Sequence, residues 1–217
     1  MNGKLKAAMI EYARKIYDEK LYGGKTDTIS VKVDEKSVYI TKTGVNFKDL
    51  TVEDIVEVKF DAADKCPAHT AKEALKHIDI YNRREDIACI MITSPVCSLA
   101  VADTKTTIPP VLDDMAQIVG ATARTAASFE TPDILKALKG RNSCLLQGIG
   151  SLSTGKTLNE AYTACMVLDK AAHTLIMATA AGGCKPVSKF HAVLERFVYQ
   201  KKYSKANQEA LLAAERE

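Results

Sequence analysis

The sequence has no hydrophobic run long enough to cross a membrane and no cluster of charge of one sign. Its strongly apolar stretches, such as residues 87–92, fall far short of the roughly 20 residues that a transmembrane helix requires. The charged start at residues 2–6 does not resemble a signal peptide. The 30 basic and 27 acidic residues are interleaved and leave a net charge of +3, so no basic surface for nucleic acid is predicted. We therefore expect a cytoplasmic protein with neither a membrane nor nucleic acid as a partner.

The sequence also lacks closely spaced cysteine pairs, and it has neither linkers nor internal repeats that would divide it into domains. Its six cysteines form no C-x-x-C pair of the kind that zinc and redox sites use, and we expect reduced thiols. No segment rich in proline, glycine or serine interrupts the chain of 217 residues, which is long enough for one hydrophobic core. We predict a single domain over residues 1–217, with a core of residues 1–185 and C-terminal helices over residues 186–217.

Hydrophobic periodicity predicts helices mixed with hairpin strands, which is typical of an α/β fold. A capping-box pattern, Thr70 followed by Glu73, predicts a helix that begins at Thr70, and Thr157 with Glu160 predicts another that reaches about Ala180. The remaining predicted helices cover residues 2–21, 94–103, 112–119 and 131–138, and the predicted strands cover residues 28–33, 38–41, 55–60, 87–92, 121–125 and 143–147.

Residues 150–157 match the phosphate-binding P-loop pattern G-x-x-x-x-G-K-[ST] in full. A P-loop domain needs further parallel strands after the helix that follows the motif, and only helices and a charged tail are predicted beyond Ala180. A short strand at residues 151–153, a turn at Gly155 and a helix cap at Thr157 explain the same residues. We therefore predict no nucleotide site here.

Several segments, taken in chain order, match the motifs of one known family. Residues 28–32 (TISVK) stand where that family has a G-N-x-S-x-R strand, and residues 40–45 (ITKTGV) are similar to its T-P-[ST]-G-V turn. Residues 50–56 (LTVEDIV) match L-T-P-E-D-I-V, and residues 71–73 (AKE) stand at an S-S-E helix start. Residues 91–95 (MITSP) replace H-T-H-S-P.

The last matching segment, residues 145–161, is similar to L-L-x-N-H-G…G-K-S-L-E-E-A. On these segments the chain resembles the class II aldolase/adducin family, which includes L-fuculose-1-phosphate aldolase and ribulose-5-phosphate 4-epimerase. The resemblance implies a single α/β domain with a central, mainly antiparallel sheet flanked by helices. It also implies a homo-oligomer, with a tetramer favoured and active sites at subunit boundaries.

The resemblance places the family's metal site at three positions that lack its ligands. Active members hold a divalent metal, usually zinc, with three histidines, whereas this chain has Met91, Thr93 and Ile149 there. A thioether, a hydroxyl and an alkyl group do not hold zinc at neutral pH. We therefore expect no metal cofactor and no zinc-dependent chemistry.

Two acidic residues are the catalytic candidates that the resemblance implies. Glu73 stands at the position of the family's acid/base carboxylate, which moves a proton at the reacting carbon. It is also the third residue after Thr70, where a glutamate closes a capping box, so both interpretations stand. In place of the family's catalytic tyrosine the chain has Asp113 or Asp114, and we take Asp113 as the second candidate.

The family's phosphate-binding positions correspond here to Thr28, Thr43, Gly44 and Lys72. Two hydroxyls, a glycine N–H and an ammonium near a helix N-terminus suit an anion such as a sugar phosphate. An exposed lysine in the first turn of a helix explains Lys72 equally well.

A replacement metal site is conceivable because Cys66, His69, Glu73 and His77 are spaced at three, four and four residues. A cap at Thr70 would leave His69 outside the helix, and the family commonly has a packing histidine at the position of His77. We therefore do not predict this site.

These replacements predict a degenerate homologue that binds a phosphorylated sugar or another small anion, or that serves as a regulatory or scaffolding subunit. The alternative is an active lyase or epimerase that acts on a small phosphorylated sugar through Glu73 without zinc. A pure assembly module, as in the adducin branch, is the third hypothesis.

Overall fold

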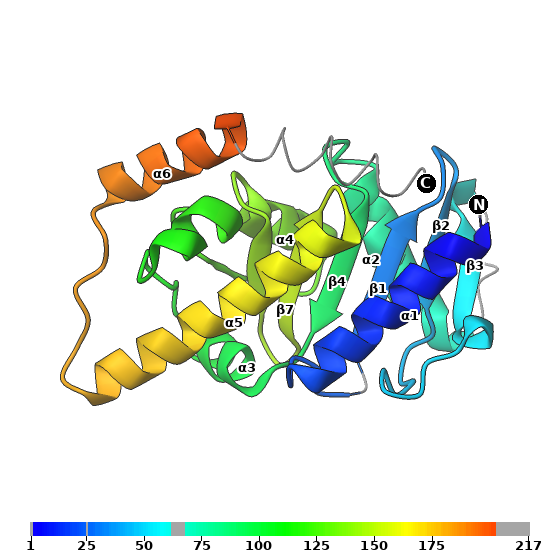
Figure 1. Ribbon diagram of the computed structural model, residues 1–217, viewed down its shortest axis with the longest axis horizontal. Coiled ribbons are helices and arrows are strands. Elements are labelled where there is room, and N and C mark those ends of the chain that lie inside the picture. The colour runs from blue at the N-terminus through cyan, green and yellow to red at the C-terminus, as the bar shows by residue number, and fades with distance from the viewer. Residues whose placement is uncertain (1, 25, 62–67, 203–217) are drawn as a thin grey trace.

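Seven strands form one sheet through the centre of the computed structural model (Figure 1), which describes residues 2–24, 26–61 and 68–202. The strand order is β3-β2-β1-β4-β7-β6-β5, and all neighbours are antiparallel except β5 and β6. The predicted mainly antiparallel sheet and the hairpin within it are confirmed. In chain order the strands are β1 (Thr28–Lys32), β2 (Ser37–Thr41), β3 (Ile55–Lys59), β4 (Cys89–Thr93), β5 (Thr125–Ala126), β6 (Ser143–Leu146) and β7 (Gly150–Gly155).

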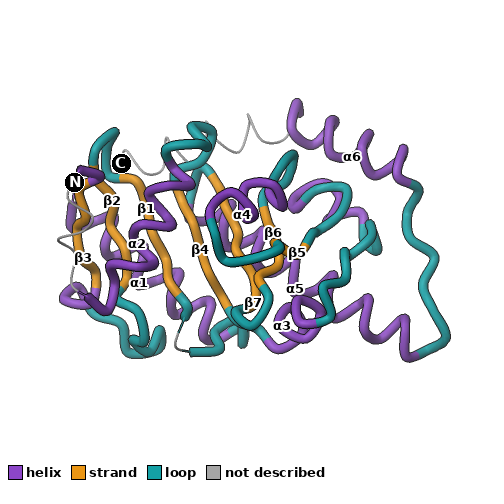
Figure 2. The backbone as a smooth tube through the Cα atoms, turned by 180° about the vertical axis from the view of Figure 1, so that it is seen from behind, coloured by secondary structure: helices purple, strands orange, loops and turns teal. Residues whose placement is uncertain are grey.

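Helices cover both faces of the sheet. Helices α1 (Asn2–Asp18) and α5 (Leu158–Ala180) lie across one face, and α2 (Ala68–Tyr81) and α4 (Thr131–Leu138) cover the other, as the two opposite views show (Figures 1 and 2). The short η1 (Val52–Asp54) leads into β3. Beside α5 lie α3 (Val96–Asp103), the π-helical turn η3 (Met115–Val119) and, packed on η3, α6 (Lys189–Lys202).

Alternation along β4 divides the core into two layers. Cys89 and Met91 pack against α1 and α5, whereas Ile90 and Ile92 pack against α2 and α4. Successive side chains of a strand point to opposite faces, so a residue's parity along β4 decides which helices it meets. This parity also decides which of the predicted site residues share a face.

The start of one predicted helix and the bounds of one predicted strand are wrong. Helix α2 begins at Ala68, so Thr70 lies inside it and is not its cap. The residue before Ala68 is a proline, which favours a helix start. The predicted helix over residues 112–119 is confirmed: residues 113–119 are helical, their last five residues are the π-helical η3, and Gly120 ends the helix with a φ of 140°. Only Thr125 of the predicted strand over residues 121–125 belongs to β5.

The P-loop pattern does not form a phosphate loop. Residues Gly150–Gly155 are strand β7, which pairs antiparallel with both β4 and β6. The Thr157 side chain accepts a hydrogen bond from the Glu160 N–H and caps α5, as predicted. The predicted strand and helix cap over these residues are therefore confirmed.

Within the described residues, the five cysteines carry free thiols, and Cys66 lies outside that part of the chain. Within the same residues, no helix is both long enough and apolar enough to span a bilayer.

Candidate functional site

Most of the predicted site residues gather at one end of the sheet, where β4 and β2 end and β1 begins. The antiparallel register sets Thr28 of β1 opposite Ile92 of β4, and Thr43 follows β2 by two residues. Because antiparallel neighbours bring the end of one strand to the start of the next, segments far apart in sequence meet here.

Glu73 faces the loop after β2. Its carboxylate accepts a hydrogen bond of 3.2 Å from the Thr43 hydroxyl. Since α2 begins before Thr70, the capping-box interpretation of Glu73 is wrong. The structure therefore joins a catalytic candidate directly to a phosphate-binding candidate.

Thr43 and Gly44 form a turn with access to solvent. Gly44 is exposed, has a φ of 82° and has no atom within 4 Å of the place a Cβ would occupy. Such a positive φ favours glycine, and the space that a side chain would occupy is open. The backbone of Lys72 lies at the fifth position of α2, beyond its first turn, and its side chain lies outside what the structure describes.

Thr28 faces the core in a buried hydroxyl network with His77. The Thr28 hydroxyl lies 3.3 Å from His77 Nε2, and the Ser30 hydroxyl lies 2.6 Å from His77 Nδ1 and 2.8 Å from the Tyr81 hydroxyl. Burial lowers the pKa of His77 to about 3, so the imidazole is neutral near pH 7. Thr28 thus belongs to the packed face of α2, while Thr43 and Gly44 reach the surface.

The positions of the family's metal ligands do not fit a metal. Met91 is fully buried among apolar side chains of α1 and α5, and Ile149 packs against the α2 layer. The Thr93 hydroxyl lies 3.0 Å from both Ser151 Oγ and Cys165 Sγ, below α5. These side chains offer no free donor of the kind that zinc prefers, and they lie on two different faces of the sheet.

The alternative set of ligands does not form a site around His77 either, because both of its ring nitrogens are engaged by hydroxyls. In the part of the chain that the structure describes, no group of three or more His, Cys, Asp or Glu is placed to hold an ion. Cys66 and the side chain of His69 lie outside that part.

Asp27 is a buried acid at this end of the sheet that the sequence analysis missed. It is fully buried and accepts hydrogen bonds from the Gly23 N–H at 2.9 Å, the Ser94 N–H at 3.3 Å and the Ser94 hydroxyl. Burial raises the pKa of its carboxyl to about 6, although these hydrogen bonds oppose the shift. Its one sequence signal is its position, directly before Thr28, where the related motif has glycine.

In the folded chain Asp113 and Glu73 belong to different parts of the structure. It is exposed just before η3, which packs against α5 and α6, whereas Glu73 belongs to α2, which packs against β2 and α4. The neighbouring Asp114 forms an ion pair of 2.8 Å with Lys170. The role of Asp113 stays a prediction.

Fold and site together define an α/β protein with a mainly antiparallel sheet flanked by helices and a group of polar candidate residues where β4 ends. The sequence model of the family described as class II aldolase and adducin N-terminal domain matches residues 7–176, and the chain belongs to this family.

Several similar proteins carry aldolase names. A 5-methylthioribulose-1-phosphate/5-deoxyribulose-1-phosphate aldolase of Rhodospirillum rubrum is 27% identical over 201 residues, which cover 89% of this chain and 90% of that protein. An L-fuculose phosphate aldolase of Methanococcus maripaludis is 25% identical over 167 residues, 75% of this chain and 91% of its own length. A solved L-fuculose 1-phosphate aldolase superposes with a TM-score of 0.80 at 20% identity and covers 91% of this chain and 96% of that one, which shows the shared fold.

Proposed function

We propose that this chain binds a phosphorylated sugar at the turn formed by Thr43 and Gly44, and that it does so without the zinc chemistry of its family. One observation carries this proposal. The three positions that the resemblance assigns to metal ligands hold a buried thioether, a hydroxyl already engaged by two neighbours, and a packed alkyl group. Related proteins named as sugar-phosphate aldolases support the ligand class.

The chemistry of the turn favours a sugar phosphate over bare phosphate. The Gly44 N–H is a donor suited to a phosphate oxygen, and the Thr43 hydroxyl becomes one when a sugar hydroxyl takes its place as the donor to Glu73. Glu73, which accepts from Thr43, carries a carboxylate that repels an anion but accepts hydrogen bonds from sugar hydroxyls. A ligand with hydroxyl groups next to its phosphate satisfies both requirements, and the role that follows is that of a binding, regulatory or scaffolding subunit.

A second candidate function follows from the same hydrogen bond. Glu73 does not cap α2, so its carboxylate is available beside the turn of Thr43 and Gly44 as a proton acceptor. In this case the protein is a metal-independent lyase or epimerase in which Glu73 removes a proton beside a sugar carbonyl.

Thermal melts and a cleavage assay test the proposal. We expect L-fuculose 1-phosphate at millimolar concentration to raise the melting temperature while unphosphorylated L-fuculose does not, because ligands that bind only the folded state stabilise it. We expect Thr43→Val to abolish this rise and Thr106→Val, at an exposed threonine outside this turn, to retain it. Cleavage that requires added zinc or manganese and stops with EDTA would contradict the proposal.

The remaining outcomes separate the other hypotheses. Metal-independent turnover that is lost in Glu73→Gln would establish the second candidate function. If no phosphorylated sugar changes the melting temperature of the correctly folded protein, the hypothesis of a pure assembly module remains.

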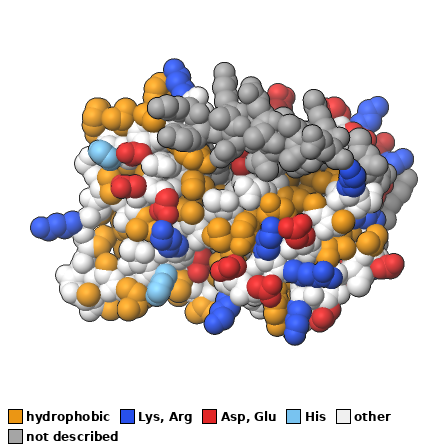
Figure 3. Space-filling model, in the orientation of Figure 1, with side chains coloured by type: hydrophobic (Ala, Val, Ile, Leu, Met, Phe, Trp, Pro, Cys, Tyr) orange, Lys and Arg blue, Asp and Glu red, His pale blue; other side chains and the backbone are white. Residues whose placement is uncertain are grey.

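We further propose that the protein is a homo-oligomer, with the tetramer implied by the resemblance. The outer face of α6 is strongly apolar: Phe190 is 82% exposed and Phe197 is 53% exposed. Part of this surface is visible as orange side chains at the α6 edge in Figure 3. Exposed apolar patches of this kind are typical of protein interfaces.

The double variant Phe190→Glu with Phe197→Glu is therefore expected to have a lower oligomeric mass in light scattering coupled to size-exclusion chromatography. Charges in an apolar interface are costly when unpaired. Val52→Glu, at an exposed valine of η1, serves as the control and should retain the mass of the wild type. Equal masses for all three proteins would exclude α6 from the interface.

A further inference from the structure

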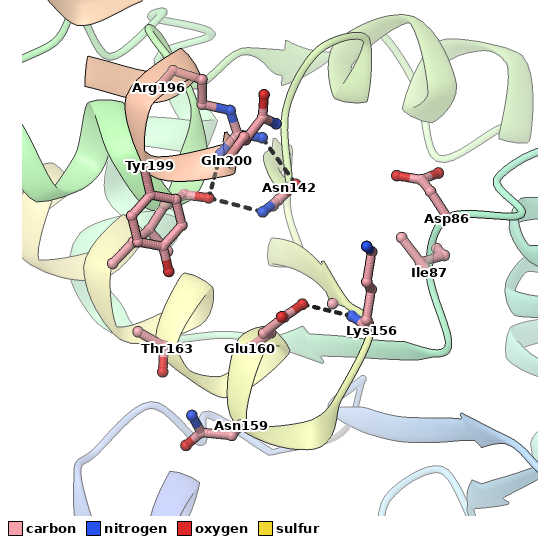
Figure 4. A pocket seen from close by; sticks show the side chains of 12 residues that line it. Asp86, Ile87, Asn142, Lys156, Asn159, Glu160, Thr163, Arg196, Tyr199 and Gln200 are labelled. Carbon is pink, nitrogen blue, oxygen red and sulfur yellow. Dashed lines mark hydrogen bonds between the residues drawn. The ribbon is translucent and has the colours of Figure 1, made fainter. Parts of the chain in front are cut away.

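A polar cleft opens at the end of the sheet opposite to Thr43 and Glu73. It lies where β4 begins and β7 ends, between the start of α5 and the inner side of α6 (Figure 4). Its volume is about 490 Å³, and it adjoins a second hollow of about 430 Å³. The two share Asp86, Asn142, Arg196 and Gln200, so they form one continuous surface.

The cleft and its neighbour carry an excess of positive charge, with six cationic side chains and two carboxylates. Both carboxylates are already engaged. Asp86 pairs with Arg84 through two contacts, of 2.6 and 2.8 Å, and Glu160 accepts the Lys156 backbone N–H at 2.9 Å. The cationic side chains are Arg83, Arg84, Lys139, Arg141, Lys156 and Arg196.

Arg196 is the buried centre of this positive surface. It is only 9% exposed, and its guanidinium donates to the carbonyls of Gln117 and Ile118 at 2.8 Å and to Asn142 Oδ1 at 3.0 Å. These acceptors are neutral, and its buried Nε has no acceptor among the described residues. Burial and, to a smaller extent, the nearby Arg84 and Arg141 lower the pKa of Arg196 to about 10. Arg196 has no carboxylate partner within the described residues; a buried charge in this situation is costly, and an anion in the cleft would reduce that cost.

We propose that this cleft binds a small phosphate-bearing molecule, with its phosphate near Lys156 and Arg196. In Figure 4 the Lys156 ammonium points into the space between Asn142 and Asp86. Concave surfaces of one sign concentrate counter-ions, and arginine with lysine is the pairing that phosphate binding commonly uses. Asn159, Thr163 and Tyr199 line the α5 and α6 side, where they offer neutral hydrogen-bonding groups to the rest of the ligand.

Titration calorimetry with pyrophosphate, at constant ionic strength against chloride, tests this site. We expect the double variant Lys156→Met with Arg84→Met to bind at least about tenfold more weakly, or about 1.4 kcal/mol, since both cationic side chains are lost from the cleft. Arg14→Met with Lys48→Met, at two other surface positions, is the matched control and should bind within about twofold of the wild type.

The Thr43→Val variant shows at which end of the sheet pyrophosphate binds. We expect it to bind pyrophosphate with the affinity of the wild type. Loss of binding in Thr43→Val would place the anion at the other site and overturn the proposal. So would equal affinity in the double variant and the wild type, or no binding to the wild type. Because the two sites lie at opposite ends of the sheet, failure here leaves the proposed sugar-phosphate site untouched.

Discussion

When the pH falls from 7 to 4, the free energy of unfolding of the Asp27→Asn variant is expected to decrease by about 3 kcal/mol, whereas the wild type largely retains its stability. The cause is a pair of buried groups with opposite shifts. The pKa of His77 is lowered to about 3, so in this range the unfolded chain binds a proton that the folded chain does not, and stability falls as the pH falls. The pKa of Asp27 is raised to about 6, so the folded chain binds the extra proton and stability rises as the pH falls.

In the wild type the contributions of His77 and Asp27 nearly cancel between pH 7 and pH 4. A variant that removes one of the two groups therefore shows the pH dependence caused by the other. Asp27→Asn retains only the destabilisation by His77. His77→Gln retains only the effect of Asp27 and should gain about 2 kcal/mol on going from pH 7 to pH 4. The variants are compared with the wild type at each pH, so that the other carboxylates contribute equally.

Urea unfolding at pH 4, 5, 6 and 7 measures these slopes. Asp113→Asn, at an exposed carboxylate, is the control and should follow the wild type. Parallel pH profiles for Asp27→Asn, His77→Gln and the wild type would show that neither group is perturbed in the folded state.

Gly150→Ala is expected to destabilise the protein by about 4 kcal/mol or more, near the upper end for single substitutions. Gly150 has a φ of 128°, and a Cβ built there would lie 2.3 Å from the Thr93 carbonyl oxygen and 2.6 Å from Ser94 Cα. Both are backbone atoms in the turn that ends β4, so relief requires the strands to move apart. The φ adds strain because L side chains rarely adopt it.

Gly148→Ala is the matched control for this prediction. Gly148 has a φ of 69° and no atom within 4 Å of the place a Cβ would occupy, so only backbone strain of about 1 kcal/mol is expected. Urea unfolding of both variants at pH 7 measures the difference. Equal losses would mean that the close approach of β7 to the end of β4 does not limit the residue at position 150.

Much of the fold could be predicted because its signals are local. Alternation in β1 and β2 predicted the hairpin, and Thr157 with Glu160 predicted the start of α5. The P-loop pattern was interpreted as a strand, a turn and a helix cap because no strands are predicted beyond Ala180. The structure has strand β7 at these residues, antiparallel to both of its neighbours. Order and spacing of short motifs predicted the family, which the match over residues 7–176 confirms.

Local patterns failed where two interpretations used the same residues. Thr70 and Glu73 fit a capping box, yet α2 begins at Ala68 and the Glu73 carboxylate meets Thr43 instead. Thr28 fits a phosphate-binding position by alignment, but the parity of β1 turns it toward His77 in the core. A side chain's partner depends on which face its strand presents, and sequence spacing does not specify it.

The amino-acid sequence by itself therefore determined the order of elements, the sheet type, the family and the replacement of all three metal-ligand positions. Only the tertiary structure decided that Asp27 meets Ser94, that Thr43 meets Glu73, and that Arg196 lies near Arg84 and Arg141. The physical reason is the same in each case. Burial and charge depend on contacts between residues far apart in the chain, and those contacts form only when the strands and helices pack.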